Sequence, residues 1–362
     1  MRIGVPRERK DGERRVGLVA DGAAALVVSG DEVLVERGAG DRVGFDDAAY
    51  ARAGARIVDD PAQIFAAPLI VKVKELQSSE LPLLQPGTTV FAFAQLGRDR
   101  ALLDAVLAAR IACESIGDAK QGMPLLEPMS RIAGRLAPLI AASLLMNDRG
   151  GSGVLLPGLD GVAPGRVVVV GAGSSGGEAA IVSSRLGCEL TVLARTERRF
   201  AALKARSGER VRTALCTEDA LAVAVAAADV VIGAVLDPGR ISPKLISRGM
   251  LRTMRKGSVF IDIGVDQGGI AETSRMTTLS APTYVEEGIV HYCVANMPAV
   301  VARTATLALT RESLKFVQAL ADLGIEEALA ADSALRAGLQ VFDGVVTHAG
   351  LAADAQLPLR RR

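Results

Sequence analysis

Apolar residues along the chain fall into short runs that alternate with amphipathic segments, which predicts alternating strands and helices. In the first third, the expected strands are Arg2–Val5, Glu32–Glu36, Leu69–Val73 and Thr89–Ala94, and the expected helices are Ala20–Val28, Ala48–Ala53 and Arg98–Arg110. A repeat of strand and helix of this kind predicts a doubly wound α/β layer. The first third is therefore expected to form an α/β domain of its own.

The remainder of the chain repeats the pattern between two long helical segments. Ser130 is expected to cap a helix that runs to about Met146 with Pro138 inside it, and a second long helix is expected over 300–323. Further strands are expected at Val167–Val170, Glu189–Leu193, Val230–Ile232 and Val259–Ile263. The 362 residues exceed one ordinary core, so the chain should cross between two domains twice.

The fold class expected is α/β, with two doubly wound Rossmann-like domains. The nucleotide domain would span residues 128–302 and would be inserted into a discontinuous substrate domain of residues 1–127 and 303–362. The last forty residues would then return to the first domain.

A glycine motif follows the valine strand at the centre of the expected inserted domain. The sequence after Val170 reads Gly171-Ala172-Gly173-Ser174-Ser175-Gly176, and Gly177-Glu178 then opens a helical pattern. Strand, G-x-G-x-x-G and helix form the context in which backbone amides and the helix N-terminus bind a pyrophosphate. A dinucleotide is therefore the expected cofactor, and its expected contacts in the motif are Gly171, Gly173, Ser174, Ser175 and Gly176.

The position that usually distinguishes NAD from NADP follows the next strand. An Asp or Glu there would accept hydrogen bonds from the ribose hydroxyls of NAD, but the sequence has Ala194-Arg195-Thr196, with Arg199 shortly after. The guanidinium groups and the hydroxyl suit a 2′-phosphate. The sequence therefore predicts NADP, with NAD as the alternative if the arginines form only a solvated helix face.

Charge and hydropathy favour small-molecule chemistry. Lys and Arg (42) nearly balance Asp and Glu (41), so net charge favours neither nucleic acid nor an anionic membrane. The N-terminus is charged from Arg2 and lacks the apolar core of a signal peptide, and the longest apolar stretch, 221–236, is short and contains Asp229. We expect a cytoplasmic protein that binds a small-molecule substrate, with no nucleic acid and no membrane as partner.

The cysteines and histidines indicate no metal site. The four cysteines lie far apart and form no C-x-x-C pair; they are Cys113, Cys188, Cys216 and Cys293. The two histidines, His291 and His348, show no metal-ligand spacing. We therefore expect buried thiols and no catalytic or structural metal.

Seven ordered blocks of sequence extend over nearly the whole chain. They are Gly4-Val5-Pro6 with Glu8, Lys10, Glu13, Arg15 and Val16; Val71-Lys72-Val73-Lys74-Glu75; Pro128-Met129-Ser130 with Ala133-Gly134-Arg135; Gly171-Ala172-Gly173; Ile232-Gly233-Ala234-Val235-Leu236 with Pro238-Gly239; Asp262-Ile263 with Asp266-Gln267-Gly268-Gly269; and Cys293 to Ala299. With these blocks the chain resembles the alanine dehydrogenase family, which shares its architecture with the NAD-binding subunit of proton-translocating transhydrogenases.

The resemblance implies a role for a residue of most blocks. Arg15 and Lys74 would bind the carboxylate and the carbonyl of a 2-oxo acid, which agrees with the bidentate geometry of a guanidinium and the point charge of an ammonium. Further substrate contacts are implied for Met129 and Asn296, a catalytic role for Asp266, and cofactor contacts for Ser130, Leu236, Val294 and Met297. From the residues alone, Arg15 also fits a solvated charge, Lys74 a structural ion pair with Glu75, and Asp266 a turn before Gly268.

Gln95 departs from the family pattern. The family's catalytic histidine follows the strand that ends here at Ala94, and the matching residue is Gln95. An imidazole can pass a proton near neutral pH, whereas an amide can only form hydrogen bonds. Three explanations stay open: Asp266 or Lys74 carries the proton, the substrate is already an iminium that Gln95 orients, or oxidoreductase chemistry has been lost. We favour the iminium.

Several functions follow from these observations. The first is an NAD(P)-dependent oxidoreductase, a dehydrogenase or imine reductase, that acts on an amino acid, its imine or a 2-oxo acid, with Lys74, Gln95 and Asp266 as catalytic residues. The alternatives are a transhydrogenase-like or non-catalytic dinucleotide-binding protein, and a cyclodeaminase-like lyase that regenerates its nicotinamide. Family members assemble into dimers or hexamers, so a homo-oligomer is expected.

Overall fold

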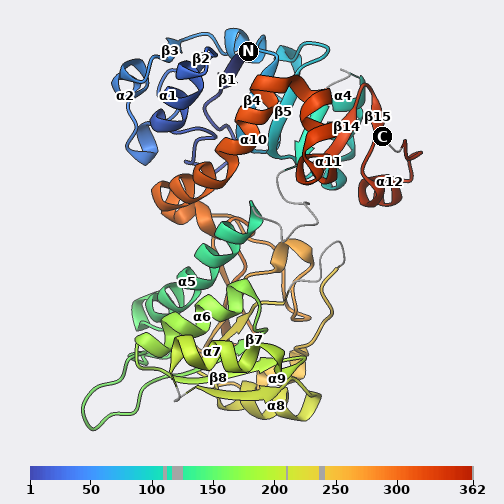
Figure 1. Ribbon diagram of the computed structural model, residues 1–362. Coiled ribbons are helices and arrows are strands. Elements are labelled where there is room, and N and C mark those ends of the chain that lie inside the picture. Colours follow the sequence, from blue (N-terminus) through green and yellow to red (C-terminus); the bar gives the residue numbers. More distant parts are fainter. Residues whose placement is uncertain (109–111, 116–124, 209–210, 236–240, 361–362) are drawn as a thin grey trace. The chain divides into compact units, whose positions relative to one another are not determined.

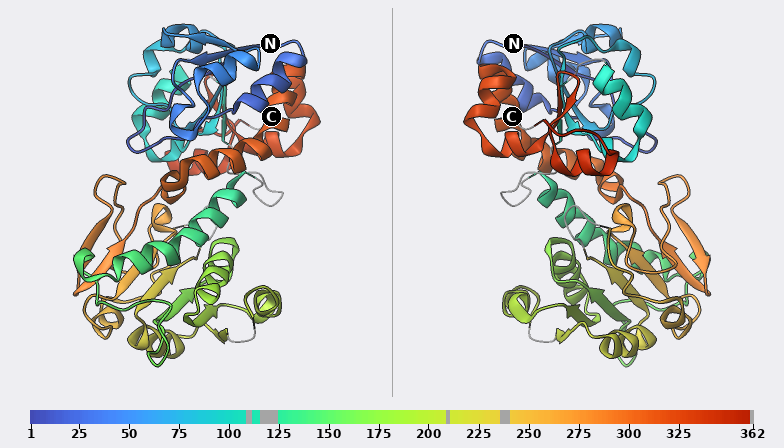
Figure 2. Two further views of the ribbon diagram at one scale, coloured as in Figure 1. Left: turned by 90° about the vertical axis from the view of Figure 1, so that its left-hand side faces the viewer. Right: turned by 90° about the vertical axis from the view of Figure 1, so that its right-hand side faces the viewer.

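The computed structural model describes residues 1–108, 112–115, 125–208, 211–235 and 241–360. The chain divides into two compact units (Figure 1). The first unit contains Met1–Met129 and Val301–Arg362, and the second contains Ser130–Val300. Each unit is built around its own sheet, and Figure 2 shows helices on both faces of each sheet.

The first unit has an eight-stranded sheet in the order β15-β14-β6-β5-β4-β1-β2-β3. Its strands are β1 (Arg2–Val5), β2 (Glu32–Glu36), β3 (Arg56–Val58), β4 (Leu69–Lys74), β5 (Thr89–Phe93), β6 (Ala112–Ser115), β14 (Leu339–Phe342) and β15 (Val345–Val346). β1 to β6 are parallel, whereas β14 pairs antiparallel with both β6 and β15. The strand order reverses between β1 and β4.

Alternating side chains of this sheet belong to two cores. Ile3 and Val71 pack with helices α1 (Ala20–Val28), α2 (Asp47–Arg52) and α10 (Ala302–Ala331) on one face. Ile70 and Val90 pack with α3 (Pro61–Phe65), α4 (Arg100–Ala108) and α12 (Ala349–Ala355) on the other. A short helix, α11 (Ser333–Gly338), precedes β14. The β4 residues are all buried, including two lysines, and this matters for the site below.

The second unit has a seven-stranded sheet in the order β12-β13-β11-β10-β7-β8-β9. Its strands are β7 (Arg166–Val170), β8 (Glu189–Ala194), β9 (Arg212–Leu215), β10 (Val230–Gly233), β11 (Val259–Asp262), β12 (Thr283–Glu286) and β13 (Ile289–Tyr292), of which only the edge strand β12 is antiparallel. The helices are α6 (Ser174–Arg185), α7 (Phe200–Ser207), α8 (Glu218–Ala227) and α9 (Arg248–Arg252). Here the strand order reverses between β7 and β10.

Two mostly parallel sheets with helices on both faces confirm the predicted α/β class. The predicted bounds of β1, α1 and β2 agree with the structure, but Ser130 does not cap a helix, because α5 (Leu126–Leu144) begins four residues earlier. The helix after the glycine motif begins at Ser174 rather than at Gly177, with Gly173 at its N-cap. The second long helix continues to Ala331, although Gly324 has non-helical dihedral angles close to its predicted end.

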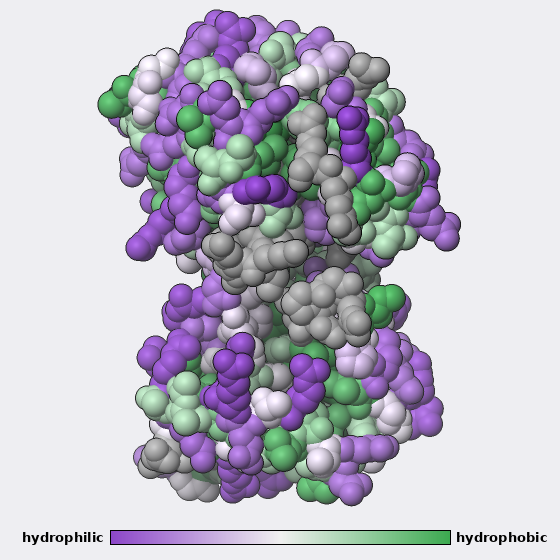
Figure 3. Space-filling view, turned by 45° about the vertical axis from the view of Figure 1, so that its right-hand side comes forward, coloured by the Kyte–Doolittle hydropathy of each residue, from purple (hydrophilic) through white to green (hydrophobic). Residues whose placement is uncertain are grey.

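Among the described residues, no helix is both long and apolar enough to span a membrane. The face drawn in Figure 3 shows hydrophobic side chains in small groups among hydrophilic ones.

Candidate active site and dinucleotide site

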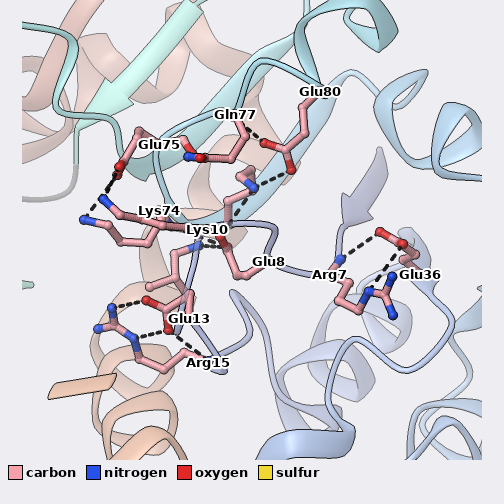
Figure 4. Close-up of polar contacts among 12 residues, drawn as sticks. Arg7, Glu8, Lys10, Glu13, Arg15, Glu36, Lys74, Glu75, Gln77 and Glu80 are labelled. Carbon is pink, nitrogen blue, oxygen red and sulfur yellow. Dashed lines mark hydrogen bonds and ion pairs between the residues drawn. The ribbon is translucent and has the colours of Figure 1, made fainter. Parts of the chain in front are cut away.

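The carboxyl edge of the first sheet carries a cluster of charged side chains at the place where the strand order reverses. β1 and β4 are neighbours there; the loop 6–19 follows β1, and Lys74 ends β4. In doubly wound sheets, ligands bind in the crevice at such a reversal, because the segments that leave the two strands diverge to opposite faces. Figure 4 shows side chains of the loop pointing toward Lys74 and its neighbours.

Arg15 is buried and is held by Glu13. Its Nε and Nη2 donate to the two carboxylate oxygens of Glu13 at 2.7 and 2.6 Å, and its Nη1 lies 3.2 Å from Met129 Sδ. Arg15 is only 3% exposed. The bidentate pair occupies one edge of the guanidinium and orients the other, which is the geometry that recognises a carboxylate.

Lys74 lies beside Arg15 in the same cluster and is also buried. Its Nζ is 3.2 Å from Glu75 Oε2, while Lys10 Nζ contacts Glu75 Oε1. Burial lowers the pKa of Lys74, the Glu75 carboxylate partly offsets this, and the positive charges of Lys10 and Arg15 add to the lowering. The structure therefore contains the ion pair between Lys74 and Glu75 that was the alternative interpretation of Lys74. The surroundings of this pair also make the Lys74 ammonium easier to deprotonate.

A second buried lysine supports this cluster from within the sheet. Lys72 Nζ lies 2.7 Å from Glu80 Oε1 and 3.4 Å from Glu8 Oε2. Burial lowers the pKa of Lys72, but Glu8 and Glu80 outweigh it and raise the pKa overall. Glu8 also accepts a hydrogen bond from the Val73 amide at 2.6 Å. The loop after β1 is thereby bound to the end of β4, which fixes the backbone next to Lys74.

Gln95 follows β5, the next strand in the sheet. In the sheet, Phe93 of β5 lies opposite Lys74, the last residue of β4. Gln95 is two residues after Phe93 and therefore lies just past the level at which β4 ends. Its φ of 47° is in the left-handed region, where non-glycine residues are uncommon and often functional. The side chain is half-buried and has no hydrogen-bond partner within the described part of the chain. Gln95 thus lies at the same carboxyl edge of the sheet as Lys74.

The glycine motif lies at the strand-order reversal of the second sheet. Gly171 follows β7 with φ 108°, and a Cβ there would lie 2.4 Å from the Ala234 carbonyl oxygen after β10. A Cβ on Gly176 would lie 1.9 Å from the Gly171 carbonyl oxygen. Both positions therefore require glycine, and the resulting tight turn brings Ser174 and Ser175 to the start of α6. This cradle fits the pyrophosphate of a dinucleotide.

Helix α5 packs against this turn. A Cβ on Gly134 would lie 2.1 Å from the Ser175 carbonyl oxygen, and Ser130 is one helical turn earlier. The contact is reinforced by the buried Glu178 of α6, whose carboxylate accepts from Arg131 and Arg135 of α5 and from Arg206 of α7, at 3.1, 2.6 and 2.7 Å. Burial raises the pKa of Glu178, but these arginines lower it overall.

The end of β8 carries the residues that the sequence associates with the ribose. Ala194 is the last strand residue and is buried, whereas Arg195, Thr196 and Arg199 are exposed. A Cβ on Gly173 would lie 3.9 Å from Arg199 Nη1, so this guanidinium lies beside the glycine turn. Three polar side chains are therefore at the edge of the proposed cofactor site, and no acidic residue ends β8.

Asp266 lies on a loop that is held from two sides. It belongs to a 3₁₀ turn, Val265–Gln267. The buried Asp262, at the end of β11, accepts hydrogen bonds from the Ile270 amide and the Ser274 hydroxyl at 2.8 and 2.5 Å. Lys244 donates to the carbonyl oxygens of Gly268, Gly269 and Ala271 at 2.6, 3.1 and 2.9 Å. The loop that carries Asp266 is therefore fixed at both ends.

The remaining predicted residues lie in the segment after β13 or outside the described residues. Val294 and Met297 are buried, and Asn296 is half-buried, with its carbonyl accepting from the Ala299 amide at 3.0 Å. Leu236 falls in the range that the structure does not describe. His291 is buried, with Nε2 2.9 Å from the Thr273 hydroxyl and Nδ1 2.9 Å from the Ile289 carbonyl oxygen, which makes it a structural residue.

The predicted residues thus form two groups, one in each unit. Arg15, Lys74, Gln95 and Met129 belong to the first, and the cofactor residues with Asp266 and Asn296 belong to the second. Sequence reasoning named Glu75 as a possible ion-pair partner of Lys74, and it gave no role to the other side chains that position these residues, chiefly Glu13, Glu178 and Lys244. The available signal was two lysines inside the otherwise apolar β4, because buried lysines require acidic partners.

No group of metal-ligating residues is found within the described ranges. Cys188, Cys216 and Cys293 are free thiols there.

Comparisons with known proteins agree over the whole chain. Residues 4–133 match the family model of the alanine dehydrogenase/PNT N-terminal domain, and residues 137–349 match that of the C-terminal domain. The alanine dehydrogenase of Halomonas elongata is 48% identical over 97% of this chain and 96% of its own length, and alanine dehydrogenase 2 of Staphylococcus aureus is 41% identical over the same shares.

Solved structures show the same similarity. An L-alanine dehydrogenase superposes with a TM-score of 0.95 at 39% identity, covering 98% of this chain and 99% of that one. A transhydrogenase from Sinorhizobium meliloti, 23% identical, shares the fold with a TM-score of 0.83 over 96% of this chain and all of that one. The two family models and the relatives together show that this chain belongs to the alanine dehydrogenase/PNT family.

Proposed function

We propose that the protein is a nicotinamide-dependent dehydrogenase that interconverts L-alanine, or another small amino acid, with its 2-oxo acid and ammonia. The observation that carries this proposal is the pair of buried cations, Arg15 and Lys74, at the strand-order reversal of the first sheet. A 2-oxo acid has a carboxylate next to a carbonyl, and these two cations match the two groups. The relatives named alanine dehydrogenase support the same assignment.

The two units divide the work in this proposal. The first unit is the substrate domain: Arg15 binds the carboxylate, Lys74 polarises the carbonyl, and Met129 lies against the Arg15 guanidinium. The second unit is the dinucleotide-binding domain, and its Asp266 and Asn296 act near the reacting carbon. A bound nicotinamide supplies hydride transfer, and the chain's own residues bind, orient and protonate the substrate.

Gln95 supports a second candidate, the reduction of an imine. An iminium accepts hydride without needing a proton on oxygen, so an amide that only orients it suffices. The left-handed backbone of Gln95, and an amide that forms no hydrogen bond with the described residues, favour a direct contact with such a substrate. A Gln95→His variant separates the two candidates, because an imidazole aids proton transfer to a carbonyl oxygen and adds nothing to hydride transfer to an iminium.

The experiment that tests the activity follows reduced-nicotinamide absorbance with both cofactors. The substrates are L-alanine, a panel of 2-oxo acids with ammonia, and cyclic imines. Turnover of alanine and of pyruvate with ammonia, raised by Gln95→His, supports the dehydrogenase. Turnover of imines alone supports the reductase. A lyase would convert substrate without net change in the cofactor, and absence of any turnover in folded protein would leave only dinucleotide binding.

We further propose a preference for NADP over NAD. The support is the missing acidic residue after β8 and the exposed Arg195, Thr196 and Arg199, with Arg199 beside the glycine turn. Ala194→Asp combined with Arg195→Ile restores the acidic residue, removes one guanidinium and is expected to reverse the preference. Calorimetric titration of the wild type and the double variant with both cofactors decides between them; equal wild-type affinities would mean that the arginines contact only solvent.

Assembly into a homo-oligomer, a dimer or a hexamer, is part of the same proposal. Three large apolar side chains of the loop before β7 are exposed to solvent in the single chain: Leu155 by 60%, Leu159 by 71% and Val162 by 63%. Exposed apolar side chains are unfavourable in water, and burial of these three between subunits would remove that exposure. Light scattering on the wild type and on Leu159→Lys tests it, and a monomeric wild type would contradict it.

A further inference from the structure

Lys74 is connected to the protein surface by one carboxylate that contacts two lysines through different oxygens. Glu75 Oε2 lies 3.2 Å from Lys74 Nζ, and Glu75 Oε1 contacts Lys10 Nζ (Figure 4). A carboxylate that contacts two lysines in this way can take a proton from one of them and pass it to the other once that lysine has lost its own proton to water. The charge of Glu75 is unchanged when both transfers are complete.

Exposure increases in steps along this series. The side chain of Lys74 is 7% exposed, that of Glu75 is 16% exposed, and that of Lys10 is 33% exposed. Lys74 is the most buried of the three side chains, and Lys10 is the most accessible to bulk water. Within the described residues, Arg15 also acts on Lys74 through its positive charge, and it is paired with Glu13.

We propose that Lys74 is the acid–base group of the reaction in place of the family's histidine, and that Glu75 and Lys10 form a proton relay between Lys74 and solvent. This inference rests on the proposed dehydrogenase function and adds to it the route of the proton. Lys74 is the catalytic residue of the three, and Glu75 and Lys10 act only through it. Gln95 then orients the substrate and transfers no proton.

In the deamination direction, a bound oxidised nicotinamide would accept hydride from the α-carbon of an amino acid whose amino group is neutral. The nitrogen lone pair would then form the C=N bond of an iminium. Water adds to the iminium carbon and gives a carbinolamine with a protonated nitrogen. Neutral Lys74 Nζ takes the hydroxyl proton, the C=O bond forms, and the C–N bond breaks with its electron pair leaving on ammonia.

The relay then restores neutral Lys74. Lys10 first releases a proton to water and becomes neutral. Lys74 then passes its extra proton to Glu75 Oε2, and the protonated carboxyl group turns and passes that proton to Lys10, which is charged again. In the reductive direction each transfer runs backwards. The lowered pKa of Lys74, caused by burial and by Lys10 and Arg15, makes the neutral amine available at lower pH than in an ordinary lysine.

A purely structural ion pair would give the same contacts, so the test must separate charge from proton transfer. Lys10→Arg does so, because arginine retains the positive charge beside Glu75 but does not give up a proton at accessible pH. Lys10→Met removes both the positive charge and the group that transfers the proton. Arg9→Gln is the matched control, because Arg9 precedes Lys10 on the same loop and pairs with Glu36 instead.

The readouts are kcat for alanine deamination across pH and the solvent deuterium isotope effect on kcat. For Lys10→Arg we expect kcat to fall about tenfold and the isotope effect to rise. The pH above which the variant becomes active should be the same as for the wild type. For Lys10→Met we expect the same fall in kcat, and we expect activity to begin at a higher pH than in the wild type. The reason is that removal of a nearby positive charge raises the pKa of Lys74. Imidazole in the buffer should partly restore both variants.

The relay is overturned if Lys10→Arg retains the wild-type kcat and isotope effect, or if Arg9→Gln lowers kcat as much. Either result leaves the proposed dehydrogenase activity intact, because the wild type still turns over alanine. A folded wild type that fails to oxidise alanine overturns the dehydrogenase itself, and the relay with it.

Discussion

At the scale of single residues, the substrate end of the protein depends on charges that are buried in pairs. The Glu13 carboxylate binds the Nε and Nη2 of Arg15, and both side chains are almost fully buried. A buried guanidinium without its carboxylate would turn toward other acceptors or toward water. Glu13 is therefore a positioning residue for the carboxylate-binding edge of Arg15.

A Glu13→Gln variant tests this role. The amide keeps the volume but loses the charge and one of two acceptors, so Arg15 is held less firmly. We expect KM for the amino acid or the 2-oxo acid to rise roughly tenfold or more, with a smaller change in kcat, because a hydrogen bond to a charged group is worth about 1.5–3 kcal/mol. Steady-state kinetics measure both values; an unchanged KM in folded protein would show that Arg15 does not depend on Glu13.

The sequence indicated these residues unequally. Lys74 stands out within an apolar strand, and Arg15 was identified only through its family block. Glu75 was considered only as a possible ion-pair partner of Lys74, and Glu13 was given no role of its own, because nothing in their neighbourhood in sequence shows that they lie at the buried edge of a sheet. Their importance arises from β1 and β4 becoming neighbours, which joins residues about sixty positions apart.

At the scale of elements, the start of α6 is determined by backbone proximity. The sequence predicted the strand, the turn and the helix, but placed the helix start three residues late because serines and glycines are poor helix formers. In the structure these residues form the first turn of α6, directly after the glycine turn. Ser130 was misplaced for a similar reason: it resembles an N-cap, yet Leu126 to Met129 extend α5 ahead of it.

Adjacent glycines of α6 allow a matched test of this arrangement. A Cβ on Gly176 would lie 1.9 Å from the Gly171 carbonyl oxygen, whereas a Cβ on Gly177 meets nothing within 4 Å. We expect Gly176→Ala to abolish dinucleotide binding and lower Tm. Gly177→Ala should bind normally and be stabilised by up to about 1 kcal/mol through helix propensity. Calorimetry and thermal melts compare the two, and similar behaviour of both variants would contradict the close packing of the turn.

The three helices around Glu178 give a prediction about pH. The arginines lower the pKa of Glu178 below its ordinary value of 4.5, so its stabilisation is present above that pH and is lost as the pH falls through the lowered value. Glu178→Gln should reduce stability by about 1–2 kcal/mol at neutral pH, a modest amount because the arginines are half-exposed to solvent. Thermal melts of both proteins at pH 7 and at successively lower pH below 4.5 should show the difference in stability shrinking as the solution becomes more acidic.

At the scale of the whole molecule, both units use the same plan. In each sheet the parallel strands follow the order 3-2-1-4-5-6, and in each the proposed ligand residues lie where the order reverses. The periodicity of the sequence was sufficient to predict two such layers. It could not predict that β14 and β15 from the C-terminal segment would extend the first sheet, because these short strands carry no signal beyond a few apolar residues.

The division between the units leads to the last prediction. Arg15 and Lys74 belong to the first unit, and the glycine turn and the end of β8 belong to the second. Since each unit has its own core, a change in the first should leave the dinucleotide-binding fold intact. Arg15→Ala and Lys74→Ala should therefore remove turnover, by about a hundredfold or more for a lost acid–base group at Lys74, while the dinucleotide Kd stays within about twofold of wild type.

The measurement combines steady-state kinetics with calorimetric titration of the dinucleotide into each full-length variant. Gly176→Ala provides the reciprocal case, because it should lose dinucleotide affinity while Arg15 and Lys74 remain in place. Both unit-1 substitutions truncate buried charges, so circular dichroism must first show that the proteins are folded. Loss of dinucleotide binding in both folded alanine variants would mean that these cations serve the cofactor, and the assignment of the first unit to the substrate would then be wrong.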